Sequence, residues 1–125
     1  MAWRFDNNSP IYIQIMEEIK LQIAKGVLKP GEKVKPVRDL ALEAGVNPNT
    51  MQKALFELER EGVLYTQRTL GRFVSEQYSG ENSIKEDMCQ KCIDSFVKGM
   101  RELGYSTEEI VSWLEKYFRE ENENV

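Results

Sequence analysis

The stretch that most constrains the fold covers residues 45–64, GVNPNTMQKALFELEREGVL. It opens with Gly45, which follows a short apolar helical pattern that begins at Pro36. Asn47 is a favourable N-cap, and Pro48 suits the first helical turn because its missing N–H would have no partner there. Two short helices joined by a tight turn that contains glycine are typical of a helix-turn-helix.

The helix predicted over residues 48–61 has an apolar face and a polar face. On a helical wheel of about 100° per residue, its buried stripe lies within about 60° of Met51. Asn and Gln side chains can bond adenine, and Lys can bond guanine or phosphate, in a major groove. The stripe consists of Met51, Ala54, Leu55 and Leu58, and the outer face of the first two turns carries the candidate contacts Asn49, Thr50, Gln52 and Lys53.

The acids of this helix all lie in its second half, at Glu57, Glu59 and Glu61. Carboxylates are favoured near helix N-termini and disfavoured near C-termini, so the helix dipole does not explain their placement. A carboxylate in the first two turns would repel phosphate. We therefore interpret the acid-free start of the helix as a candidate nucleic-acid contact, and the acidic half as the part that has left the groove.

A β-hairpin is predicted directly after this helix. Residues 63–67 and 72–76 are rich in β-branched and aromatic side chains, and residues 68–71, RTLG, form the turn between them. A hairpin in this place is the wing of a winged helix-turn-helix, and arginine at its tip can enter a minor groove. The candidate contacts around the second helix and the wing are Lys35, Arg38, Arg68, Gly71 and Arg72. For all of these residues the alternative is an ordinary solvated surface.

The chain before the helix-turn-helix is predicted to form an arm, a helix and a connection. Residues 1–8 are a short arm, and Ser9 is expected to cap a helix that has Pro10 in its first turn. The connection over residues 28–36, LKPGEKVKP, is rich in turn formers. The first helix has an apolar stripe of Tyr12, Ile15, Ile19 and Ile23.

The polar segment over residues 75–83 predicts a boundary between a winged-helix domain, 1–78, and a C-terminal part, 79–125. Two helices are expected in the C-terminal part, and Ser106 with Glu109 forms a capping box at the start of the second. This αα-hairpin carries more apolar side chains than it can cover itself. The residues predicted to face a second subunit are Phe96, Met100, Ile110, Trp113, Leu114 and Tyr117.

Composition excludes several classes of protein and favours others. The chain contains no histidine, which removes the commonest general base and most zinc sites, so we expect no catalytic residues, no metal and no cofactor. No apolar run approaches the roughly 20 residues of a membrane span, and no signal peptide is visible, so we expect a cytoplasmic protein without a membrane partner. The net charge of −4 divides into +1 for residues 1–78 and −5 for residues 79–125.

Three blocks resemble the GntR family of regulators: SPIYIQIMEEIKLQIAKGVLKPGEKV, VRDLALEAGVNPNTMQKALFELEREGVL and RTLGRFV. The resemblance covers residues 9–74 and implies a repressor that binds a palindromic DNA operator as a homodimer. Helix 48–61 would lie in the major groove and the 68–72 wing at the adjacent minor groove. Arg72 stands where the family commonly has a small residue, so the operator sequence does not follow from the resemblance.

The short C-terminal part resembles the YtrA-type subfamily of these regulators. That resemblance implies dimerisation through two helices and control of an ABC-transporter operon, and it identifies no small-molecule effector. The expected fold is therefore mainly α with one small β-hairpin: a winged helix-turn-helix followed by a two-helix dimerisation hairpin.

Two rival functions stay open from the sequence. Cys89 and Cys92 are three residues apart and could face one ligand on a helix, which is compatible with a thiol or metal sensor, although buried small hydrophobic residues are the commoner use of this spacing. The acidic overall charge is compatible with a winged helix that binds another protein and no DNA. An enzyme is not expected.

Overall fold

The computed structural model describes residues 3–78 and 84–123. Its contacts divide the chain into two compact units, Met1–Asp87 and Met88–Val125. The predicted boundary segment lies partly outside the described residues. The division into a DNA-binding part, 1–78, and a dimerisation part, 79–125, therefore stays a prediction.

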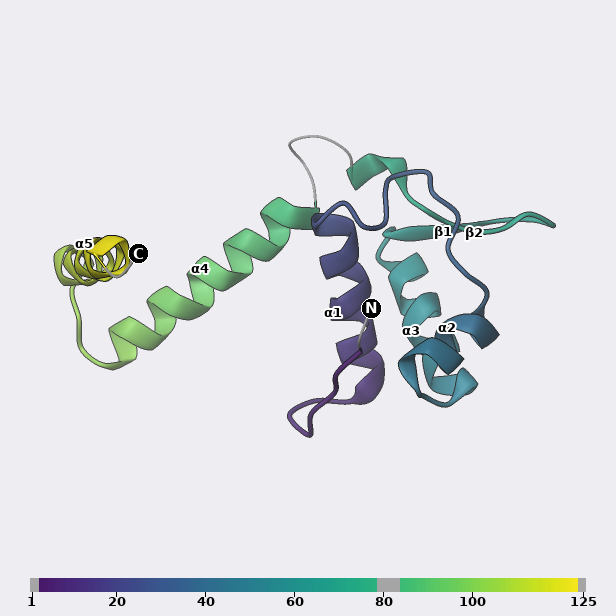
Figure 1. The fold of residues 1–125 in the computed structure, drawn as a ribbon, viewed down its shortest axis with the longest axis horizontal. Coiled ribbons are helices and arrows are strands. Elements are labelled where there is room, and N and C mark those ends of the chain that lie inside the picture. Colours follow the sequence, from purple (N-terminus) through teal and green to yellow (C-terminus); the bar gives the residue numbers. More distant parts are fainter. Residues whose placement is uncertain (1–2, 79–83, 124–125) are drawn as a thin grey trace. The chain divides into compact units, whose positions relative to one another are not determined.

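The first unit is a three-helix bundle with a β-hairpin (Figure 1). It contains α1 (Ile11–Ala24), α2 (Val37–Ala44), α3 (Pro48–Arg60), β1 (Leu64–Gln67), β2 (Gly71–Val74) and a 3₁₀ turn at Glu76–Tyr78. α3 is central, because it packs against α1, α2 and β1. The predicted stripe of α3 is wholly buried, and Ile15 and Ile19 of α1 are buried with it, which confirms the helical periodicity seen in the sequence.

The start of α1 differs from the prediction. The helix begins at Ile11 with Pro10 as its N-cap, and no side chain caps it, so the expected role of Ser9 was wrong. The side chain of Gln14 instead makes the hydrogen bonds at this end of the helix, because its amide offers both a donor and an acceptor. It donates to the backbone oxygens of Asp6 and Ser9 at 2.9 and 2.7 Å and accepts from the Asp6 N–H at 2.9 Å, which ties the N-terminal arm to the helix.

The hairpin has the predicted strands and an additional neighbour. β1 and β2 are antiparallel, with Thr66 opposite Arg72 and Gln67 opposite Gly71. On the other edge of β2, the segment that was expected to be only a turn-rich connection forms a bridge between Lys33 and Phe73. The N–H of Val34 donates to the Arg72 oxygen at 2.8 Å. The base of the wing is thus held from both sides.

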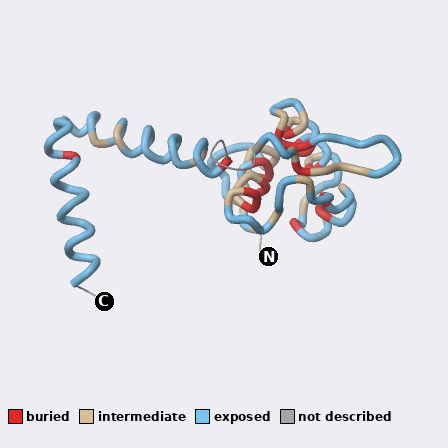
Figure 2. The backbone as a smooth tube through the Cα atoms, turned by 90° about the horizontal axis from the view of Figure 1, so that it is seen from above, coloured by how far each residue is buried: buried red, intermediate tan, exposed pale blue. Residues whose placement is uncertain are grey.

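The second unit contains most of α4 (Ile84–Glu102) and all of α5 (Thr107–Glu123). The predicted capping box is confirmed: Ser106 N–H donates to Glu109 Oε1 at 3.0 Å, and Glu109 N–H donates to Ser106 Oγ at 3.2 Å. The two helices meet at this turn but do not pack along their lengths, unlike a closed αα-hairpin. Figure 2 shows both helices mostly exposed. Of their described residues, Ile84 at the start of α4, which belongs to the first unit, and Ile110 near the turn are buried.

None of the helices in the described part of the chain is long and apolar enough to cross a membrane.

Candidate nucleic-acid interface

The start of α3 presents the predicted polar side chains as one exposed face. Gly45 ends α2 in the left-handed conformation, with φ of 71°, and this reverses the chain between the two helices. Asn47 Oδ1 then accepts the Asn49 N–H at 2.7 Å, which confirms the predicted N-cap. Gln52 and Lys53, one turn later, are exposed, as is Asn49, and Thr50 is half-buried. No acid lies in the first turn of α3.

Lys53 has a partner that the sequence analysis did not foresee. Its Nζ lies 4.1 Å from the centre of the Tyr12 ring, which is a cation–π contact between α3 and α1. Tyr12 was expected to belong to the apolar stripe of α1, yet it is only half-buried. Its ring therefore orients the Lys53 ammonium, and the helical stripe alone could not separate this role from core packing.

The basic residues near the start of α2 differ in their surroundings. Arg38 is exposed and makes no ion pair with any residue in the described part of the chain. Lys35 Nζ lies 2.9 Å from Glu43 Oε2. The hydrogen bond with Glu43 and the carboxylate charge raise the pKa of Lys35, and the same hydrogen bond lowers the pKa of Glu43. Lys35 would have to leave Glu43 to reach a phosphate, whereas Arg38 is available as it stands.

The tip of the wing is a turn over residues 68–70, in which Arg68 and Leu70 are exposed. Gly71 has φ of 115°, and a Cβ there would stand 3.0 Å from Cε of Lys33, so a larger residue would meet both backbone strain and a close contact. Lys33 thus lies against the wing and joins the basic candidates. Sequence analysis missed it because its segment was assigned to a connection.

Arg72 is not a free wing residue. Its Nε donates to Oε1 of Glu59 at 2.5 Å, and Thr66 Oγ1 donates to the same carboxylate oxygen. The Arg72 and Glu59 side chains are only 18% and 23% exposed. Burial acts to raise the pKa of Glu59, but the hydrogen bonds from Thr66 and Arg72 and the arginine charge outweigh it and hold that pKa below its usual range.

The other two acids of the second half of this helix segment also have cationic partners. Glu57 Oε1 lies 3.2 Å from Arg60 NH1, and Glu61 Oε1 lies 2.7 Å from Lys20 Nζ on α1. These contacts inside the first unit give the late position of the acids an explanation that does not depend on DNA.

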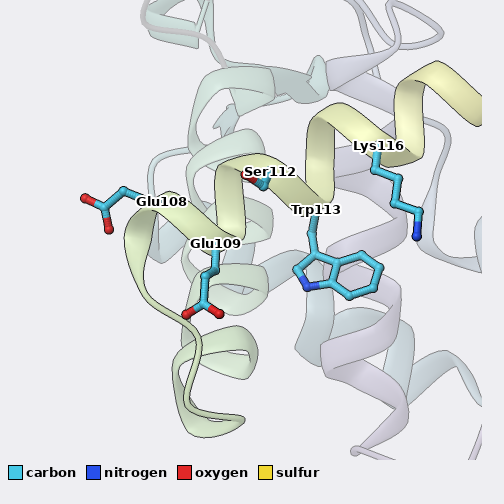
Figure 3. A pocket seen from close by; sticks show the side chains of 5 residues that line it. All are labelled: Glu108, Glu109, Ser112, Trp113 and Lys116. Atoms are coloured by element: carbon cyan, nitrogen blue, oxygen red, sulfur yellow. The ribbon is translucent and has the colours of Figure 1, made fainter.

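The predicted dimerisation residues gather in the second unit. A groove of about 470 Å³ is lined by aromatic and aliphatic side chains that include five of the six predicted positions, and the sixth, Ile110, is buried near the turn. A second, more polar surface on α5 shares Trp113 with the groove and carries Lys116, whose Nζ lies 5.1 Å from the centre of the Trp113 ring (Figure 3). The groove is lined by Phe96, Met100, Leu103, Tyr105, Trp113, Leu114 and Tyr117.

The two cysteines, Cys89 and Cys92, are both exposed on α4, not buried. Among the described residues no group of three or more His, Cys, Asp or Glu side chains is placed to hold a metal ion. The thiol pair therefore has no further ligand in the described part of this chain.

Comparison with known proteins gives a consistent result. Residues 11–74 match the family model described as bacterial regulatory proteins, gntR family. The HTH-type transcriptional repressor YtrA of Bacillus subtilis is 37% identical over 88% of this chain and 85% of its own length. A GntR family transcriptional regulator from Listeria monocytogenes superimposes with a TM-score of 0.81 at 35% identity, over 90% of this chain and 98% of that one.

A structure of the DNA-binding domain of AraR in complex with operator ORX1 is also similar, with a TM-score of 0.54 and 29% identity. It covers 60% of this chain and 99% of that chain. The fold, the family model and the relatives all identify a regulator and no enzyme. The chain belongs to the GntR family of DNA-binding transcriptional regulators.

Proposed function

We propose that this protein is a repressor that binds a palindromic operator as a homodimer, with α3 in the major groove and the wing at the adjacent minor groove. One observation carries the proposal: the capped, acid-free start of α3 exposes Asn49, Gln52 and Lys53 together. Amide and ammonium groups of this kind read base edges and bind phosphate. The AraR domain, solved with its operator, supports the same use of a similar fold.

The geometry of DNA and the apolar surface of the second unit support the proposed homodimer. One helix-turn-helix reads a single half-site, and two half-sites about one helical turn apart require two-fold symmetry. The open apolar groove between α4 and α5 supplies a surface that a second copy would cover. We also propose control of an ABC-transporter operon and action in the cytoplasm, on the basis of the resemblance to YtrA-type regulators.

The test measures binding to the DNA upstream of the protein's own gene by fluorescence anisotropy, at several salt concentrations. We expect a palindrome to be bound and the affinity to fall steeply with salt, because Lys and Arg displace counterions from phosphates. Lys53→Glu and Gln52→Glu should each abolish binding. Lys91→Glu makes the same charge change as Lys53→Glu at an exposed position of α4 and should leave affinity almost unchanged.

Circular dichroism and thermal unfolding of each variant show whether it is folded. Binding that does not depend on sequence or salt, or equal losses in Lys53→Glu and Lys91→Glu, would contradict the proposal. Failure to bind any promoter fragment would favour the protein-binding alternative.

A further inference from the structure

A single carboxylate joins the end of α3 to both strands of the wing. Glu59 lies in the last turn of α3 and accepts hydrogen bonds from Thr66 of β1 and Arg72 of β2. Thr66 and Arg72 are directly opposite each other in the hairpin register. The next pair, Gln67 and Gly71, is the last before the turn, so the carboxylate holds the hairpin close to its exposed tip.

We propose that Glu59, Thr66 and Arg72 form a brace that fixes the wing relative to α3, and that Arg72 is a positioning residue instead of a phosphate contact. This inference rests on the proposed DNA binding, because the position of the wing matters most when both elements meet one duplex. It also revises the role that the sequence indicated for Arg72.

A wing of this size needs such support. A two-stranded hairpin is marginally stable by itself, and residues 68–70 extend beyond the last strand pair. A wing that is already held in place loses less conformational freedom on binding, so the gain in affinity comes from preorganisation. The low exposure of the Arg72 side chain, 18%, agrees with a group committed to the protein.

The brace and simple electrostatics predict opposite effects on DNA affinity when the Glu59 carboxylate is removed. Glu59 carries a negative charge close to the elements that would meet phosphate, so on charge alone its removal should strengthen DNA binding. If the carboxylate holds the wing, its removal should weaken binding. The sign of the effect therefore separates the two roles.

The experiment compares Glu59→Ala, Arg72→Met and the double variant with Glu57→Ala. Glu57 is a matched control, because it is an acid of the same helix with similar exposure, 29% against 23%, and its partner Arg60 lies on α3 itself. We expect Glu59→Ala and Arg72→Met each to weaken operator binding roughly tenfold, the size expected for a lost charged hydrogen bond. The double variant should lose little more, because each single change already breaks the brace.

Amide hydrogen exchange in the protein without DNA tests the brace independently. Exchange in residues 64–74 should rise by about tenfold in Glu59→Ala and Arg72→Met, and should match the wild type in Glu57→Ala, with the amides of α1 as the reference for global stability. A wild type that binds no operator would refute the proposed function. The exchange measurement needs no DNA, so it would still show whether Glu59 and Arg72 hold the wing in place.

Two results would overturn the brace. One is wild-type wing exchange in Glu59→Ala. The other is weaker DNA binding in Arg72→Met together with unchanged or stronger binding in Glu59→Ala, which would identify Arg72 as a phosphate contact.

Discussion

The three acids that follow the first two turns of α3 each contact a cationic side chain within the first unit. A substitution there changes an ion pair as well as the local charge. Glu59→Lys, which on charge alone should strengthen DNA binding, would place an ammonium beside Arg72 and disrupt the wing. Glu57, whose partner Arg60 lies on the same helix, is the position where charge can be varied with the least structural effect.

The N-cap of α3 can be tested on its own. Asn47→Ala removes the acceptor of the Asn49 N–H, and we expect it to lower the free energy of unfolding by about 1 kcal/mol. Asn47→Asp keeps an acceptor at the helix N-terminus and should be close to wild type. Urea unfolding of the three proteins measures the difference. Equal destabilisation by Ala and Asp would show that the side-chain oxygen does not cap the helix.

At the scale of the element, the wing should respond to acid through Glu59. Its pKa is held below the ordinary value near 4.5, so the ionised form stabilises the folded wing above that value. This contribution is lost as the pH falls through the lowered pKa. Carbon-13 NMR titration should show Glu59 protonating at lower pH than that ordinary value.

Arg72→Met supplies the complementary measurement. It removes the arginine hydrogen bond and charge, while the burial that raises the pKa of Glu59 remains, so that pKa should move upward. An unchanged titration of Glu59 in Arg72→Met would show that the arginine does not set it.

Local signals predicted some elements of the first unit and could not predict others. α3 was predictable because its cap, its first-turn proline and its apolar stripe all lie within 14 consecutive residues, Asn47–Arg60. The bridge between Lys33 and Phe73 could not be predicted in this way, because its two residues are 40 positions apart in the chain. The start of α1 was misassigned because Gln14, a residue inside the helix, ties down the arm in place of a capping serine.

The candidate site shows the same limit. Asn49, Gln52 and Lys53 could be placed on one face from helical spacing alone. The contacts of Tyr12 with Lys53 and of Glu59 with Arg72 join residues from different elements, and no local pattern in the sequence reports them.

At the scale of the whole molecule, the second unit leaves much of its apolar surface exposed. Phe96, Trp113, Leu114 and Tyr117 are each more than a third exposed, and such a concentration of apolar surface on two helices is characteristic of an interaction site. A partner helix in the groove would supply the packing that α4 and α5 do not give each other. Dimerisation would then complete the fold of this unit and also couple two copies of α3.

Leu114→Glu tests this coupling, with Ser112→Glu as its control. The two positions lie about 200° apart around α5, so the same new carboxylate would face the groove in one variant and point away from it in the other. We expect the wild type and Ser112→Glu to be dimers at micromolar concentration and Leu114→Glu to be a monomer, as measured by sedimentation equilibrium. A monomer can engage only one half-site at a time, so Leu114→Glu should bind the operator on the order of a hundredfold more weakly. A wild type that sediments as a monomer and binds DNA one to one would contradict the dimer, and a dimeric Leu114→Glu would place the interface elsewhere.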